Sequence, residues 1–187
     1  DFADELYDVH EVADGSVVAM GRKGEKTIVA ITFDAEGKVV STSSDYSEDR
    51  DLEYFFHIGQ SIRDNKGNIY FLGHGNIYIQ EYYNYYKSAI VVKVDAKGKI
   101  EWIRTQHDEV GVFSTYIRFI GDEKLCVIYA GKRTYLSFIT TDNELFQDIA
   151  FNANYNALFA WPVNDEYTQF NLYDNYGRII HIDTEGE

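Results

Sequence analysis

The chain has 187 residues, a formal net charge of −14 and a sequence pI of about 4.7. So acidic a chain repels polyanions, which makes nucleic acid and anionic membrane surfaces poor partners. No stretch approaches the ~20 apolar residues of a membrane-spanning helix, so no membrane insertion is expected.

Two turn signals alternate along the chain, and both begin with an aspartate. The first kind precedes an apolar strand and occurs at Asp14-Gly15, Asp64–Gly67, Asp122-Glu123 and Asp165-Glu166. The second kind has the form Asp-x-x-Gly and occurs at Asp34–Gly37, Asp95–Gly98, in degenerate form at Asp142–Leu145, and at Asp183–Gly186. The separations from first to second turn are 20, 31, 20 and 18 residues, so the second repeat is about eleven residues longer than the others.

Each repeat resolves into short β-branched and aromatic runs that predict strands. The clearest is Ile90–Val94, which runs through the turn Asp95–Gly98 into the alternating segment Lys99–Arg104. We predict four strands in each of the first three repeats and three in the last. The repeats span about residues 5–45, 53–106, 113–151 and 156–187.

A four-stranded antiparallel meander that recurs every ~40–60 residues is typical of a β-propeller blade. The sequence therefore predicts a single all-β, β-propeller-like domain of about four blades, the last incomplete. A two-sheet sandwich is the alternative all-β fold. Because the last repeat lacks an outer strand, we expect the chain to be a portion of a longer propeller.

The segments Val17–Gly21 and Ile69–Gly73 are apolar strands that end in glycine, and Ile90–Trp102 joins a strand, an Asp-x-x-Gly turn and a Trp-bearing outer strand. In these features the chain resembles a bacterial β-propeller repeat family with quinoprotein-type blades. The resemblance implies the fold. The quinone-binding residues of quinoproteins are not recognisable, so no cofactor is expected.

The variable segments are expected at one rim of the blades, where binding usually resides. They are Arg22–Lys26, Ser44–Glu53, His74–Ser88, Gln106–Phe113 and Asn152–Asn156. The segment His74–Ser88 is rich in tyrosine, which suits recognition of sugars or protein surfaces. The alternative is that it packs on its own blade or extends two strands into a long hairpin.

The candidate ligand-binding residues combine these tyrosines with polar groups of the same rim: Tyr82, Tyr83, Tyr85, Tyr86, His74, His107, Asp49 and Asp51. The link Asp45–Glu53 could bind a hard cation, although its spacing matches no EF-hand and a solvated acidic loop is the simpler interpretation. None of the five histidines, His10, His57, His74, His107 and His181, has the spacing of a known metal or catalytic motif. No metal site is therefore predicted.

The remaining chemistry is sparse. Cys126 lies in the apolar run Leu125–Tyr129 and is expected to be a buried thiol. No carboxylate pair of the glycosidase kind can be nominated from the sequence. We therefore expect a non-enzymatic module, of extracellular or cell-surface origin, that binds a protein or glycan. The alternative is the propeller portion of a larger secreted, carbohydrate-active enzyme.

Overall fold

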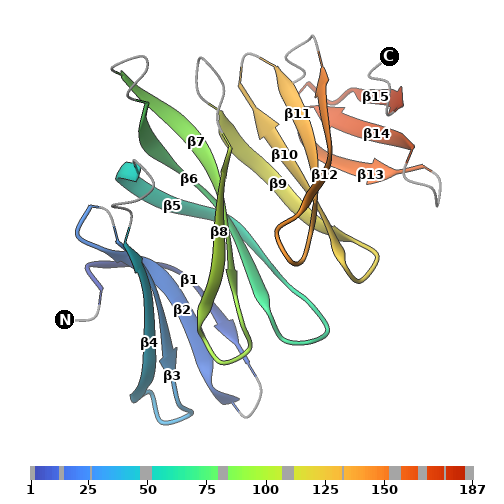
Figure 1. Cartoon of the computed structure of the whole chain (residues 1–187). Coiled ribbons are helices and arrows are strands. Elements are labelled where there is room, and N and C mark those ends of the chain that lie inside the picture. The colour runs from blue at the N-terminus through green and yellow to red at the C-terminus, as the bar shows by residue number, and fades with distance from the viewer. Residues whose placement is uncertain are drawn as a thin grey trace. The chain divides into compact units, whose positions relative to one another are not determined.

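The structure, a computed structural model, consists of β-strands in four antiparallel sheets (Figure 1). It describes residues 3–12, 15–25, 27–46, 52–79, 84–106, 112–131, 133–151, 157–163, 168–174 and 176–183. The chain divides into two compact units, Asp1–His107 and Asp108–Glu187. The described residues include no helix long and apolar enough to cross a membrane.

The first unit contains two sheets, blade 1 and blade 2, whose strands lie side by side in chain order. The strands of blade 1 are β1 (Glu5–Glu11), β2 (Val17–Lys23), β3 (Thr27–Phe33) and β4 (Val39–Tyr46). Those of blade 2 are β5 (Leu52–Arg63), β6 (Ile69–Ile79), β7 (Asn84–Val94) and β8 (Ile100–Gln106). Within each blade the strands are lettered a to d in chain order.

The second unit contains blade 3, with four strands, and blade 4, with three described strands. Blade 3 has β9 (Phe113–Ile120), β10 (Lys124–Ala130), β11 (Thr134–Thr140) and β12 (Leu145–Phe151). Blade 4 has β13 (Ala157–Pro162), β14 (Gln169–Asp174) and β15 (Ile179–Asp183). The prediction of an all-β, β-propeller-like fold of about four meander blades, the last incomplete, is confirmed.

The Asp-x-x-Gly turns form as expected between strands c and d of blades 1 and 2. In blade 2, Asp95 Oδ1 accepts a hydrogen bond from the backbone N–H of Lys99 at 2.8 Å, and Gly98 adopts a φ of +84°. In blade 1, Asp34 Oδ1 accepts the equivalent bond from Lys38 at 2.7 Å. A carboxylate acceptor and a left-handed residue together define this turn.

In blade 3 the predicted turn Asp142–Leu145 is wrong by two residues. Thr140 leads the turn, because the backbone N–H of Glu144 donates to its Oγ1 at 3.0 Å. Asn143 takes the position of the glycine, with a φ of +71°. A threonine hydroxyl accepts hydrogen bonds as an aspartate does, and asparagine tolerates left-handed φ, so this turn keeps its shape without its motif.

Blade 4 has an Asp-x-x-Gly turn that was not predicted, between strands b and c. All such turns were expected at the opposite end of the blades. Asp174 is buried, and its Oδ2 accepts a hydrogen bond from Arg178 Nε at 2.6 Å. Burial acts to raise the pKa of Asp174, but hydrogen bonds from Arg178 and the backbone of Tyr176 outweigh it and hold the pKa below its usual range.

Every blade has a β-bulge at the same place in strand a. The extra residues are Tyr7, Gly59, Thr115 and Leu158. Blades 1 to 3 have a second bulge near the start of strand d, at Val40, Glu101 and Phe146. Because the bulges recur in the same register, equivalent residues of different blades can be identified one by one.

The extra length of the second repeat lies in the connection between strands b and c. The offset between blades 1 and 2 is 52 residues at Gly21 and Gly73, but 61 residues at Val29 and Ile90. Nine residues are therefore inserted there. The sequence estimate of about eleven is too large, because the counterpart of Asp64 in blade 1 is Val12, whose N–H bonds to the carbonyl of Ser16.

Each unit has its own apolar core between its two sheets. In the first unit, side chains of blades 1 and 2 meet, among them Val18, Met20, Ile28, Ala30, Ile69, Phe71, Ile90 and Val92. In the second unit the core includes Cys126, Ile128, Leu136, Phe138, Phe170, Leu172 and Ile182. Burial of one face of every sheet against a neighbouring sheet is what holds each pair of blades together.

Candidate functional site

The β6–β7 hairpin carries the inserted residues and part of the predicted site. Its strands pair continuously from Ile69 opposite Val94 to Ile79 opposite Asn84. Four of these residue pairs lie beyond Gly75 and Ser88, whose counterparts end the equivalent hairpin of blade 1. Most of the segment His74–Ser88 is therefore an extension of two strands, which was one of the structures that the sequence left open.

The tyrosines of this hairpin do not form one group. Tyr86 is half-buried and packs against the apolar core of the first unit. Tyr85 lies opposite Tyr78 in the strand pairing, and its side chain is not among those described. Tyr82 and Tyr83 fall outside the described residues. Tyr86 therefore contributes to packing, whereas binding by the other three tyrosines stays a prediction.

The polar residues of the predicted site are placed in part. His74 is half-buried on β6, where it lies opposite His57 of β5. His107, Asp49 and Asp51 fall outside the described residues. Short histidine spacings do not reveal this pairing, because the two histidines face each other only when residues are counted outward from the Asp64 turn and across the Gly59 bulge.

A polar cluster that the sequence did not predict joins strands a of blades 1 and 2. Ser61 of β5 donates its hydroxyl proton to Asp8 Oδ2 of β1, and it lies 2.5 Å from His10 Nε2. Because this hydroxyl has a single proton, His10 must carry a proton on Nε2 and donate it to Ser61 Oγ. The ring of His10 also stands edge-on to Phe71, with centroids 5.7 Å apart.

The geometry of this cluster differs from that of a serine hydrolase. A nucleophilic serine gives its proton to the histidine, and the carboxylate binds the other ring nitrogen. In this cluster the hydroxyl points to the carboxylate, and Asp8 Oδ2 is 3.7 Å from the same His10 Nε2 that faces Ser61. The cluster therefore connects two blades through a chain of hydrogen bonds and does not activate Ser61.

A second polar group lies at the start of β1, beside an open hollow. Glu5 binds Arg22 through both carboxylate oxygens, at 2.9 and 3.2 Å, and accepts the hydroxyl proton of Tyr7 at 2.7 Å. The Arg22 hydrogen bonds lower the pKa of Glu5 to about 2. Burial and the hydrogen bond to Glu5 raise the pKa of Tyr7 to about 12. These three side chains therefore stay in one ionisation state over the physiological range.

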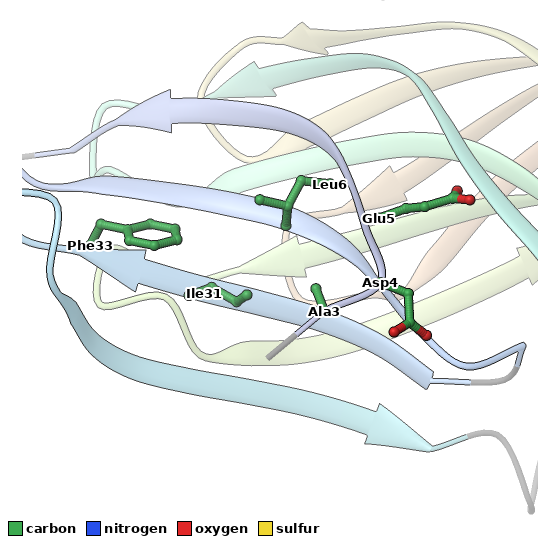
Figure 2. Close-up of a pocket in the computed structure, with 6 residues that line it drawn as sticks. All are labelled: Ala3, Asp4, Glu5, Leu6, Ile31 and Phe33. Atoms are coloured by element: carbon green, nitrogen blue, oxygen red, sulfur yellow. The ribbon is translucent and has the colours of Figure 1, made fainter. Parts of the chain in front are cut away.

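The hollow has a volume of about 410 Å³ (Figure 2). It is bounded by residues of the N-terminal segment and of β3, namely Ala3, Asp4, Glu5, Leu6, Ile31 and Phe33. The carboxylate of Asp4 is engaged, since its Oδ2 accepts the backbone N–H of Gly24 at 2.6 Å. With Glu5 also paired, most of the surface that remains for an occupant is apolar.

Metal and thiol chemistry find no support among the side chains that the structure describes. In that part of the chain, no group of three or more His, Cys, Asp or Glu residues could hold a metal ion. Cys126 is buried in the core of the second unit, and its burial raises the pKa of the thiol to about 12. This agrees with the prediction of a buried, unreactive cysteine.

The chain matches no protein-family model and no curated protein sequence. Among solved structures it resembles a Bacteroides caccae protein of unknown function, with 13% identity, a TM-score of 0.46, and coverage of 97% of this chain and 64% of that one. It also resembles two mutants of a Synechocystis apocarotenoid oxygenase, each at 11% identity, with TM-scores of 0.44 and 0.41 and coverage of 98% of this chain and 48% of theirs. The chain thus spans less than two thirds of the length of these neighbours. At such identities and TM-scores, the likeness assigns neither a ligand nor an activity.

Proposed function

We propose that this chain is a non-enzymatic binding module that recognises a protein or glycan through the end of the β6–β7 hairpin. The observation that supports the proposal is the nine-residue insertion, which lengthens strands b and c of blade 2 but not those of blade 1. The other described b and c strands have five to seven residues, whereas β6 and β7 have eleven each. A long extension on a repeated scaffold is where binding surfaces usually develop.

The composition of the extension favours recognition by aromatic contact. Tyr82, Tyr83 and Tyr85 follow one another within four positions at its end. Tyrosine offers a broad face and a hydroxyl at a small cost in conformational entropy, which suits sugars and protein surfaces alike. The blades are proposed to be of the quinoprotein-like type that the sequence resembles, and this resemblance adds no ligand to the binding proposal.

The proposal is tested with the double variant Tyr82→Ala/Tyr85→Ala, probed on a glycan array and against a panel of purified extracellular proteins. We expect the wild-type chain to bind at least one probe, and the double variant to lose at least tenfold in affinity, since an aromatic anchor contributes about 2 kcal/mol or more. Its Tm should stay within about 2 °C of wild type.

Two matched controls separate binding from folding. Tyr176→Ala removes a tyrosine that is 70% exposed in the second unit, so it should leave binding unchanged and lower Tm only slightly, through the lost contact with the Arg178 guanidinium. Tyr86→Ala should lower Tm, because Tyr86 packs against the core. A double variant that binds its probe as well as wild type would refute the proposal, and one that melts far below wild type would show that these rings are part of the fold.

A further inference from the structure

Blade 4 has a sheet face that is partly exposed, whereas the equivalent faces of blades 1 and 3 are buried. Counted from the strand-a bulge, the positions of Asn171 and His181 in blade 4 are those of Val18 and Thr32 in blade 1 and of Cys126 and Phe138 in blade 3. The residues of blades 1 and 3 are at most 7% exposed, but His181 is exposed and Asn171 is half-buried. An amide and an imidazole therefore stand where the other blades bury mostly apolar side chains.

The side chains of this face form two rows across the three strands. Trp161 pairs with Asn171, and Asn171 pairs with His181, so these three lie side by side in one row. Tyr173 pairs with Ile179 in the next row. Because successive side chains of a strand alternate between its faces, all five point away from the core of the second unit. Ile179 is 65% exposed and both rings are half-buried, so the face offers apolar surface beside polar groups.

The first row can both donate and accept hydrogen bonds. His181 Nδ1 lies 3.1 Å from Asn171 Oδ1. An amide oxygen only accepts, so Nδ1 carries the proton and the neutral ring leaves Nε2 as an acceptor. The amide nitrogen of Asn171 supplies two N–H donors. A donor and an acceptor thus stand on adjacent strands, about 5 Å apart, with the ring of Trp161 on the other side of the amide.

We propose that this face of blade 4 binds an uncharged oligosaccharide. Trp161 takes the apolar face of a sugar ring, while Asn171 and His181 hydrogen-bond to neighbouring hydroxyls, each of which can donate and accept. The two rows include no acidic side chain and no lysine or arginine, although the chain has a net charge of −14, so a neutral partner suits this face better than an ion. The site is separate from the β6–β7 hairpin and does not rest on the function proposed for it.

Tryptophan fluorescence tests the proposal directly. The chain has two tryptophans, so Trp102→Phe leaves Trp161 as the only one. We expect at least one neutral oligosaccharide from a glycan array to bind the wild-type chain in calorimetry and to change the emission of Trp161 in this variant. Asn171→Ala and His181→Ala should each weaken binding at least fivefold. Tyr176→Ala, an exposed ring in the turn between strands b and c of the same blade, is the control and should not change the affinity.

Four results would overturn the proposal. No neutral oligosaccharide of the array could change the emission of Trp161. Asn171→Ala and His181→Ala could both bind the oligosaccharide as tightly as wild type. A purified extracellular protein could bind through these residues while no oligosaccharide does, which would identify a protein as the occupant. Finally, the double variant Tyr82→Ala/Tyr85→Ala should bind this oligosaccharide as wild type does, and loss of its binding there would place the sugar at the hairpin.

Discussion

In both units two blades pack against each other, but different side chains meet at the equivalent point of contact. In each, strand a of one blade approaches strand a of the next at an equivalent point of the register. In the first unit His10 and Ser61 meet there, with Asp8 completing the chain of hydrogen bonds. In the second unit Arg118 is the counterpart of His10, and its Nη1 donates to the backbone carbonyl of Ala160, the counterpart of Ser61, at 3.4 Å.

The difference shows which part of the interface the backbone determines. The bulges and the strand pairing bring the two strands together in both units, whatever side chains they carry. A hydroxyl acceptor depends on the residue at position 61, whereas a backbone carbonyl is present with any residue at position 160. At this point the first unit therefore depends on two specific polar side chains, whereas the second needs only the arginine and a backbone carbonyl.

The largest effect is expected from a substitution in the core of the second unit. Phe170→Ala removes a fully buried ring that packs on Phe138, and it should lower the free energy of unfolding by about 3–5 kcal/mol. Urea unfolding measures the change. Tyr176→Ala, at an exposed turn, is the control and should cost at most about 1 kcal/mol, since its ring contacts only the Arg178 guanidinium among the ring contacts described. A loss below about 1 kcal/mol for Phe170→Ala would contradict the view that this core holds blades 3 and 4 together.

A smaller effect is expected in the first unit, from a substitution in the blade 2 turn between strands c and d, which packs against blade 1. Gly98→Ala places a Cβ against Thr32 on a backbone with a φ of +84°, so left-handed strain and overpacking add to about 2–5 kcal/mol. Gly37 has a similar φ of +79°, but a Cβ there would meet nothing within 4 Å. Gly37→Ala should therefore cost only about 1–2 kcal/mol. Thermal unfolding of both variants compares the two. Equal losses would show that the contact with Thr32 adds nothing.

The smallest effect is expected from a substitution where strand a of blade 1 meets strand a of blade 2. Ser61→Ala gives the first unit the residue that stands at the equivalent place in the second, and it removes the bridge between His10 and Asp8. Since both side chains keep access to water, the loss should be about 1 kcal/mol. Ser44→Ala, an exposed serine of β4, is the control. A stability equal to wild type would show that the polar cluster contributes nothing to the contact between blades 1 and 2.

The sequence predicted the blades better than it predicted the turns and the site. Strand alternation and the turns at Asp34 and Asp95 were sufficient for the fold, because these turns use the commonest residues for their geometry. The turn led by Thr140 was misplaced, because a hydroxyl and an asparagine perform the roles of the usual aspartate and glycine. Different side chains can therefore form this turn, as long as the backbone keeps the same shape.

Contacts between distant segments were beyond the reach of sequence spacing. His10 and Ser61 are 51 residues apart and meet only because two blades pack face to face. The pairing of His57 with His74 depends on a bulge that adds one residue to strand a. No single-sequence rule locates such a bulge, since its extra residue is Tyr7 in one blade and Gly59 in the next. The candidate site was therefore predicted as a list of loop residues, without the contacts among them.

The nine-residue insertion in blade 2 also has a practical consequence for protein engineering. From Arg63 opposite Ile69 to His57 opposite His74, the pairing of β5 with β6 keeps the register of blade 1, and the two further register shifts of β5 lie opposite the inserted residues. The end of a blade where strands b and c meet thus accepts extra sequence without disturbing the rest of the sheet. The shorter b–c connection of blade 1, around Gly24, is correspondingly a place where a foreign peptide could be grafted and displayed.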